Sequence, residues 1–200
     1  MTYFQFGNLT IPGIWISAVI ALILSSLLNR FIGEKKTEEW LINGFILLFL
    51  VWKLSYVLFH FSMFIEMPLS IIYFSGGWKG QILALVVVSI YLLVFAGKKY
   101  PSIYKESTRI FLFYYLIYEI TISFLEKNIV ETFLHFIVFA GFVVTLFYLK
   151  KKETTLSRQI VIVIYMLELL IISLFQPIFT MELLTFTWLA VTMLILTKKR

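Results

Sequence analysis

"WLINGFILLFLVWKLSYVLFHF", residues 40–61, is an apolar run of the length that a helix needs to cross a bilayer. A membrane-spanning helix takes roughly 20 consecutive, mostly apolar residues, because the hydrocarbon core is about 30 Å thick. The run contains one charged side chain, Lys53, which lies between Trp52 and Leu54. The stretch therefore predicts a membrane span that keeps a charge inside it.

The whole chain has the composition of a membrane protein. Its 200 residues are 61% hydrophobic and 14% charged, and the mean hydropathy is +0.96. A soluble domain of this length exposes too much surface to carry so few charges. The chain has no cysteine, which excludes disulfides, thiol catalysis and thiolate metal sites. We expect an all-α, polytopic integral membrane protein, because the apolar runs are continuous and do not alternate as in a β-barrel.

Apolar runs of suitable length recur along the chain. We expect seven transmembrane helices, at about residues 11–28, 40–61, 81–97, 110–125, 132–149, 160–175 and 183–197. The sequence shows no internal repeat and no long linker, so we expect one transmembrane domain over residues 1–200. The connection over residues 62–80 carries Pro68 and the Gly76–Gly77 pair, which interrupt a helix. Its apolar side chains predict a segment that lies in the membrane interface.

The basic residues lie mainly on alternate connections between the spans. Of the 17 lysines and arginines, 14 follow the first, third, fifth or seventh span: Arg30, Lys35, Lys36, Lys98, Lys99, Lys105, Arg109, Lys150, Lys151, Lys152, Arg158, Lys198, Lys199 and Arg200. Cytoplasmic loops carry an excess of lysine and arginine, so the pattern predicts an N-terminus outside and a cytoplasmic C-terminus. The net charge of +6 is then explained by these loops, and no nucleic acid partner is expected.

Three ionisable residues lie well within the predicted spans, namely Lys53, Glu119 and Glu168. Each costs at least a few kcal/mol near the bilayer centre unless it is paired or hydrated. Their helical neighbours include polar side chains, which predicts faces that turn into the bundle: Tyr56 and His60 beside Lys53, and Tyr115 and Ser123 beside Glu119.

Two interpretations of these charges remain open. In the first, an outward-facing polar cavity binds an anionic lipid headgroup, with Lys53 as the cationic contact. In the second, Lys53 forms a buried ion pair with Glu119 or Glu168 that only fixes helix packing. The charges alone favour neither interpretation over the other.

The sequence identifies no catalytic residue and no cofactor site. His60 and His135 each lie near the outer end of a predicted span, which is an ordinary position for a histidine. We therefore assign neither of them a chemical role. Two distant histidines among glutamates lack metal-ligand spacing, and no metal site is expected. The chain contains no phosphate loop, no nucleophile motif and no dinucleotide fingerprint, so no cofactor is expected either.

Several stretches together match the motifs of one family. Residues 4–15, "FQFGNLTIPGIW", resemble its opening phrase F-x-L-G-P-L-x-I-x-W-Y-G, and residues 52–59, "WKLSYVLF", resemble A/G-R-x-x-Y-V-L-F. Pro68 and Gly76–Gly77 fit P-x-x-I-x-x-x-x-G-G, and residues 132–135, "TFLH", are similar to T-F-L-Y-E. The chain thus resembles the bacterial prolipoprotein diacylglyceryl transferases. These seven-span enzymes move a diacylglyceryl group from phosphatidylglycerol to the lipobox cysteine of a prolipoprotein.

The chain departs from the family where the family has its essential cations. Lys53 stands where the family has an arginine, and the histidine expected soon after Gly77 is absent. Residues 114–128, "YYLIYEITISFLEKN", have no arginine and no glycine, and residues 165–176 have no arginine. Arginine grips a phosphate with two parallel hydrogen bonds, whereas lysine supplies one point charge. The departures predict a family scaffold whose catalytic centre is changed or lost.

The resemblance and the departures from it together lead to an expected function. We expect a protein of the bacterial cell membrane that binds a phosphatidylglycerol-like phospholipid, or a lipoprotein or membrane-protein partner, from the outer leaflet. The lipid-binding residues would be Lys53, Tyr56, Lys79, Glu119 and Glu168. One alternative is an active membrane transferase in which lysines and a desolvated glutamate take new roles. Another is a small transporter or a subunit of a membrane complex.

Overall fold

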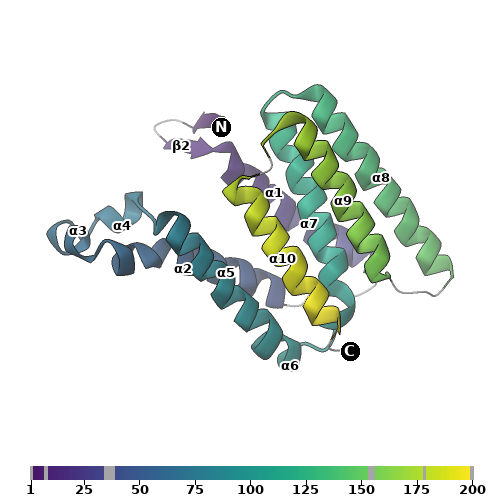
Figure 1. The fold of residues 1–200 in the computed structure, drawn as a ribbon, viewed down its shortest axis with the longest axis horizontal. Coiled ribbons are helices and arrows are strands. Elements are labelled where there is room, and N and C mark those ends of the chain that lie inside the picture. The colour runs from purple at the N-terminus through teal and green to yellow at the C-terminus, as the bar shows by residue number, and fades with distance from the viewer. Residues whose placement is uncertain (1, 7–8, 34–38, 153–155, 178, 199–200) are drawn as a thin grey trace. The chain divides into compact units, whose positions relative to one another are not determined.

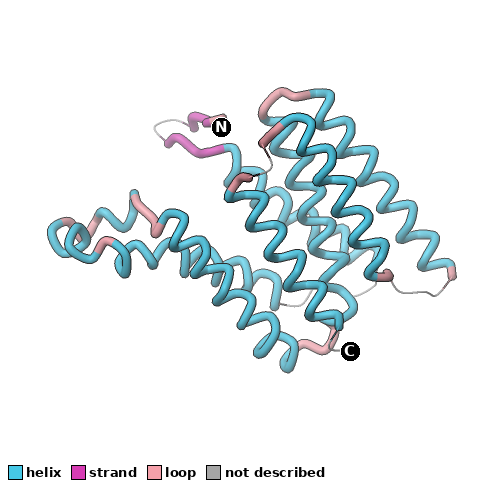
Figure 2. The backbone as a smooth tube through the Cα atoms, viewed as in Figure 1, coloured by secondary structure: helices cyan, strands magenta, loops and turns pink. Residues whose placement is uncertain are grey.

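The structure, a computed structural model, describes residues 2–6, 9–33, 39–152, 156–177 and 179–198. Among these residues, seven helices are long and apolar enough to cross a membrane, which confirms the predicted number of spans. The chain therefore has the architecture of a multi-pass membrane protein, built almost entirely of helices (Figures 1 and 2). Its orientation across the membrane stays a prediction.

The seven spans follow one another with short connections. They are α1 (Gly13–Gly33), α2 (Trp40–Phe59), the continuous run of α5 (Gly77–Ile90), η1 (Tyr91–Ala96) and α6 (Gly97–Lys99), then α7 (Ile103–Leu125), α8 (Ile129–Lys151), α9 (Arg158–Phe175) and α10 (Met181–Lys198). The largest difference from the predicted bounds is in α7, which begins seven residues before residue 110. The sequence-based bounds follow hydropathy, which identifies the apolar part of a helix. The hydrogen-bonded helix continues into the polar residues that precede or follow that part.

The chain is almost entirely helical, as predicted, but its N-terminus forms two short strands that the sequence analysis did not predict. Strands β1 (Tyr3–Phe6) and β2 (Leu9–Pro12) pair in an antiparallel two-stranded sheet, with Tyr3 opposite Pro12 and Phe6 opposite Leu9. The first span was predicted to start at residue 11, but Ile11 belongs to β2 and the helix begins at Gly13. Proline has no N–H to donate to a ladder, so Pro12 fits the end of a strand, at the junction with the helix.

The described residues group into two compact units, which are treated one at a time. The first unit, Met1–Thr37 and Lys105–Thr180, contains β1, β2, α1, α7, α8 and α9. Aromatic contacts tie α7 to both of its neighbours, since the rings of Phe113 and Phe142 are centred 5.1 Å apart and those of Tyr115 and Tyr165 5.2 Å apart. Helices α7, α8 and α9 accordingly lie side by side (Figure 1).

The turn between α7 and α8 is fixed by local hydrogen bonds. Lys127 has a left-handed backbone with φ of 62°, and Asn128 follows it as the N-cap of α8. The Glu131 backbone N–H donates to Asn128 Oδ1 at 3.3 Å, and Asn128 Nδ2 donates to Glu131 Oε2 at 2.8 Å. The first of these bonds satisfies one of the backbone N–H groups that the first turn of a helix leaves open. The second bond fixes the Glu131 side chain at the start of α8.

The second unit, Glu38–Tyr104 and Met181–Arg200, is centred on the packing of α2 and α10 against α5. Two short helices, α3 (Phe61–Glu66) and α4 (Ser70–Tyr73), lie between α2 and α5. Helix α3 ends before Pro68, and α5 starts at Gly77, whose φ is +58°. Proline and glycine therefore interrupt the helix within residues 62–80, as the sequence predicts.

Small residues allow α2 and the start of α5 to approach closely. The Gly76 N–H donates to the Trp52 carbonyl at 3.1 Å. A Cβ atom on Gly76 would lie 2.9 Å from the Ser55 Cβ and 2.9 Å from the Gly80 Cα, which is closer than real contacts allow. Close packing of small residues is a main source of helix association in membranes. The start of α5 is thereby held at the level of residues 52–55.

Hydrogen bonds between side chains join α5 to α10. Gln81 Nε2 donates to Thr185 Oγ1 at 3.1 Å, and the Ser89 and Thr192 hydroxyls are 3.1 Å apart. The Trp188 indole N–H donates to Ser89 Oγ at 2.9 Å. Such bonds between apolar helices contribute on the order of 0.6 kcal/mol each in a membrane protein. They set the rotation of α10 against α5.

Candidate functional site

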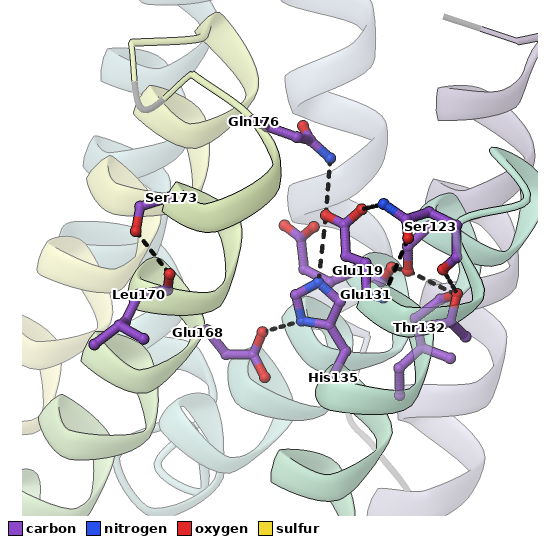
Figure 3. A network of polar contacts seen from close by, with 11 residues as sticks. Glu119, Ser123, Glu131, Thr132, His135, Glu168, Leu170, Ser173 and Gln176 are labelled. Atoms are coloured by element: carbon purple, nitrogen blue, oxygen red, sulfur yellow. Dashed lines mark hydrogen bonds and ion pairs between the residues drawn. The ribbon is translucent and has the colours of Figure 1, made fainter.

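Helices α7, α8 and α9 of the first unit bury a cluster of ionisable side chains. Glu119 on α7 is 5% exposed, Glu131 on α8 is 2% exposed, and His135 on α8 and Glu168 on α9 have no exposed surface. Figure 3 shows these side chains together between the helices. Ionisable groups inside membrane helices are expensive unless they interact with one another, and they mark functional sites by default. We therefore consider this cluster as the candidate site of the first unit.

The centre of the cluster is a contact between an imidazole and a carboxylate. His135 Nδ1 lies 2.5 Å from Glu168 Oε2, and the two side chains come from adjacent helices (Figure 3). The other ring nitrogen of His135, Nε2, lies 3.7 Å from Glu131 Oε1. Within the described part of the chain, His135 Nε2 and Glu168 Oε1 have no hydrogen-bond partner. The ring is thus held between two carboxylates, closely by one and loosely by the other.

Glu131 connects the cluster to one end of the helix bundle. Its Oε2 accepts from Asn128 Nδ2 at 2.8 Å, and its Oε1 accepts from Gln176 Nε2 at 3.1 Å (Figure 3). Asn128 caps the start of α8, and Gln176 is the C-cap of α9. The Glu131 carboxylate therefore ties the beginning of α8 to the end of α9, beside the turn that follows α7.

Glu119 brings a third carboxyl group to the cluster, from α7 (Figure 3). Ser123, four residues later, donates to the Glu119 carbonyl at 2.5 Å, and it is 1% exposed. Tyr115, four residues earlier, has no exposed surface. The predicted inward face around Glu119 is therefore confirmed. Around Lys53 the prediction holds for Tyr56, which is buried, and is wrong for His60, which is exposed.

Two residues of this cluster were not identified as functional from the sequence. His135 was assigned no chemical role, and Glu131 was not singled out. One signal was present, because Glu131 and His135 are four residues apart and therefore share one face of a helix. Glu168 follows His135 by 33 residues, and no local pattern links positions so far apart.

The second unit contains the remaining predicted site residues. Lys53 Nζ donates to the Ile72 carbonyl at 2.8 Å, which joins α2 to α4. The Tyr56 ring is stacked on His60, with centroids 5.3 Å apart, and on Phe74, with centroids 5.9 Å apart. Tyr56 is 2% exposed, and its hydroxyl has no hydrogen-bond partner among the described residues. Lys53, the charged residue inside the second span, thus binds the connecting segment of residues 62–80 through a hydrogen bond.

Lys79 lies in the first turn of α5 and is exposed. Its ammonium nitrogen is 5.9 Å from the centroid of the Trp78 ring. The five predicted lipid-binding residues are thus divided between the units, with Lys53, Tyr56 and Lys79 in the second and Glu119 and Glu168 in the first. An ion pair of Lys53 with either glutamate stays a prediction.

No group of three or more metal-ligating side chains among the described residues could hold a metal ion. Comparison of the chain with protein-family models, with curated proteins and with solved structures gives no match. The resemblance to the prolipoprotein diacylglyceryl transferases therefore stays a prediction.

Proposed function

We propose that this multi-pass membrane protein binds an anionic, phosphatidylglycerol-like phospholipid from the outer leaflet, and through it a lipid-modified protein partner. The observation that carries the proposal is the contact of Lys53 with the Ile72 carbonyl, at 2.8 Å. It holds a cation beside a connecting segment whose side chains are apolar and exposed. A cation next to an apolar surface fits a phospholipid, which has an anionic headgroup and apolar chains.

The connecting segment supplies the apolar half of this arrangement. Most of its large side chains are exposed: Phe61, Met63, Ile65, Met67, Leu69, Ile72, Tyr73 and Phe74. A segment of this kind is stable in the membrane interface, where its apolar side chains reach the acyl chains. The segment follows a membrane span directly, so it begins at the membrane surface.

The cationic half consists of Lys53 and Lys79. An ammonium group has three N–H donors, and the contact with Ile72 uses one of them. Lysine binds a phosphate as a point charge. Lys79 lies at the same end of the second unit as Lys53. The adjacent Gly80 packs against α2, because a Cβ atom on Gly80 would lie 3.2 Å from the Trp52 carbonyl oxygen. Lys53 and Lys79 therefore both lie close to the ends of the connecting segment.

Lipid retention tests this proposal. The protein would be purified from membranes that contain phosphatidylglycerol, and the bound lipid counted by native mass spectrometry. We expect Lys53→Met to lose most of the retained anionic lipid, and Lys53→Arg to keep it. Lys98→Met is the matched control, since Lys98 is an exposed lysine at the far end of the third span, which begins beside Lys79. Equal retention in Lys53→Met and the control would contradict the proposal.

A second candidate function is transfer of a diacylglyceryl group, as the family resemblance suggests. The burial of Glu168 favours it, because a carboxyl group removed from water can serve as a general acid or base. The assay mixes the protein with phosphatidylglycerol labelled in its acyl chains and a lipobox peptide, beside an active transferase. Label on the peptide that disappears in Glu168→Gln would support transfer. Labelled lipid that stays on the protein, with an unlabelled peptide, would favour binding alone.

A further inference from the structure

The three groups Glu131, His135 and Glu168 form a series that runs from one end of the helix bundle into its interior. Glu131 is the third residue of α8, and His135 follows four residues later, which places it about 6 Å deeper at 1.5 Å per residue. Glu168 is seven residues from the end of α9, or about 10 Å along the helix axis. The series therefore reaches well into a hydrocarbon core of about 30 Å.

We propose that Glu131, His135 and Glu168 form a buried proton-binding site that exchanges protons with water at the α7–α8 turn. Glu131 is the entry group, His135 is the carrier, and Glu168 is the inner acceptor. This inference does not rest on lipid binding or on transfer, because it concerns the resting protein. Its ligand is the proton alone.

The geometry permits a balanced proton transfer through the imidazole. A proton leaves the Glu131 carboxyl group and binds to His135 Nε2, so that the ring becomes an imidazolium and Glu131 a carboxylate. The Nδ1 proton then passes to Glu168 Oε2, 2.5 Å away, which leaves a neutral ring in its other tautomer. The first step spans 3.7 Å between Nε2 and Glu131 Oε1, a gap that a small side-chain movement closes.

The cluster contains buried atoms that can still accept a proton. A buried polar atom without a partner costs about 1–3 kcal/mol, and binding a proton at such an atom offers one way to reduce that cost. In the described part of the chain, His135 Nε2 and Glu168 Oε1 are buried without a hydrogen-bond partner. Both are atoms that accept a proton. Glu119 adds a third carboxyl group from α7, so each of the three helices contributes a titratable group (Figure 3).

Polar residues adjoin the described site at one end of the bundle. At the end near Glu131, the polar residues Asn128 and Gln176 contact the entry carboxylate. Beyond the cluster, the buried residues of α8 and α9 are mostly apolar: Phe142, Leu146, Val161, Ile164 and Tyr165. Since the described parts of α8 and α9 have no buried carboxylate or imidazole beyond Glu168, the proposed path ends at Glu168, and a proton bound there leaves by the same groups.

The two histidines of the chain allow a direct test by nuclear magnetic resonance. The protein would be labelled with ¹³C and ¹⁵N in histidine only, reconstituted in nanodiscs, and followed from about pH 5 to about pH 8. His60, exposed in the second unit, is the internal reference, and His60→Gln assigns the two signals. We expect the His135 ring signals to change with pH between neutral and protonated forms. A His135 ring that keeps one neutral tautomer throughout would overturn the proposal.

Two variants separate the roles of the carboxylates. Glu168→Gln keeps the shape of the side chain but cannot take the proton, so the proton should stay on His135 Nδ1 and the ring signals should differ from those of the unsubstituted protein. Glu131→Gln should slow proton exchange of His135 at least several-fold. The His60 signal reports on the second unit, and an unchanged helical circular dichroism spectrum shows that the first unit is folded in each variant. If both variants leave the His135 titration and exchange as in the unsubstituted protein, the series is not a proton path.

A flux measurement tests whether the site is open at one end only. Protein would be reconstituted in liposomes that carry an internal pH dye, and a pH gradient imposed. We expect no more proton leakage than in protein-free liposomes. Leakage that is lost in Glu131→Gln would overturn the inference that the path ends at Glu168.

Discussion

His135 Nδ1 on α8 lies 2.5 Å from Glu168 Oε2 on α9, and neither side chain has any exposed surface. Each residue alone would be a costly polar group inside an apolar helix. Together they form a polar contact that fixes the rotation of α8 and α9 against each other. The same contact gives the first unit a pair of buried groups that can exchange a proton.

Removal of the Glu168 carboxylate should destabilise the first unit. Glu168→Ala leaves the buried imidazole without its hydrogen-bond partner, which costs about 1–3 kcal/mol. Glu168→Gln keeps a polar partner in place and should cost less. Unfolding in mixed micelles with increasing sodium dodecyl sulfate measures the free energy difference. Glu66→Ala removes an exposed carboxylate and should change little; an equal loss in both alanine variants would refute a specific role for the contact.

The tight packing of α2 against α5 predicts that Gly76 does not tolerate a side chain. Gly76→Ala places a Cβ atom 2.9 Å from the Ser55 Cβ and the Gly80 Cα, and overpacking of this kind costs about 1–3 kcal/mol. The matched control is Gly141→Ala, where a Cβ atom meets nothing within 4 Å. That change should be neutral or stabilising by up to about 1 kcal/mol, since alanine is the better helix former. Similar thermal stability of the two variants would show that the approach at Gly76 is looser than described.

The hydrogen bonds of Ser89 predict a measurable role in holding α10 to α5. Ser89→Ala removes the contacts with Thr192 and with the Trp188 indole N–H, and at about 0.6 kcal/mol for each bond the total loss is about 1 kcal/mol. Ser173→Ala is the control, because the Ser173 hydroxyl bonds within its own helix, to the Leu170 carbonyl. Ser89→Ala should also change the fluorescence of Trp188, whose indole N–H loses its hydrogen-bond partner. No change in either readout would argue against this link.

The distribution of basic residues predicts that the two termini lie on opposite sides of the membrane. Because the chain has no cysteine, single cysteines can be introduced at Thr2 and at Lys198 without a background signal. A membrane-impermeant maleimide applied to intact cells should label Thr2→Cys and leave Lys198→Cys unlabelled until the cells are opened. Labelling of both from the outside would rule out seven crossings in this orientation.

The number of spans could be predicted from the sequence, because whether a helix suits water or hydrocarbon depends on the residues of that helix alone. A run of apolar residues such as 40–61 is long enough to cross hydrocarbon whatever lies beside it. The interruption near Pro68 and Gly77 was equally predictable, since both residue types act on the backbone at their own position. The helix ends were less predictable, as the early start of α7 shows, because helical hydrogen bonds continue where the apolar residues stop. The short sheet at the N-terminus was missed, because its strands are too short to carry a clear pattern.

The partners of the charged residues were decided by the tertiary structure alone. The sequence marked Lys53, Glu119 and Glu168 as costly in a membrane, since that cost depends only on charge and solvent. It could not show that Lys53 meets the Ile72 carbonyl, or that Glu168 meets His135. Those contacts depend on how far each helix is rotated and on which helix lies next to it. Rotation and neighbours are set by packing across the whole unit, so no local stretch of sequence contains them.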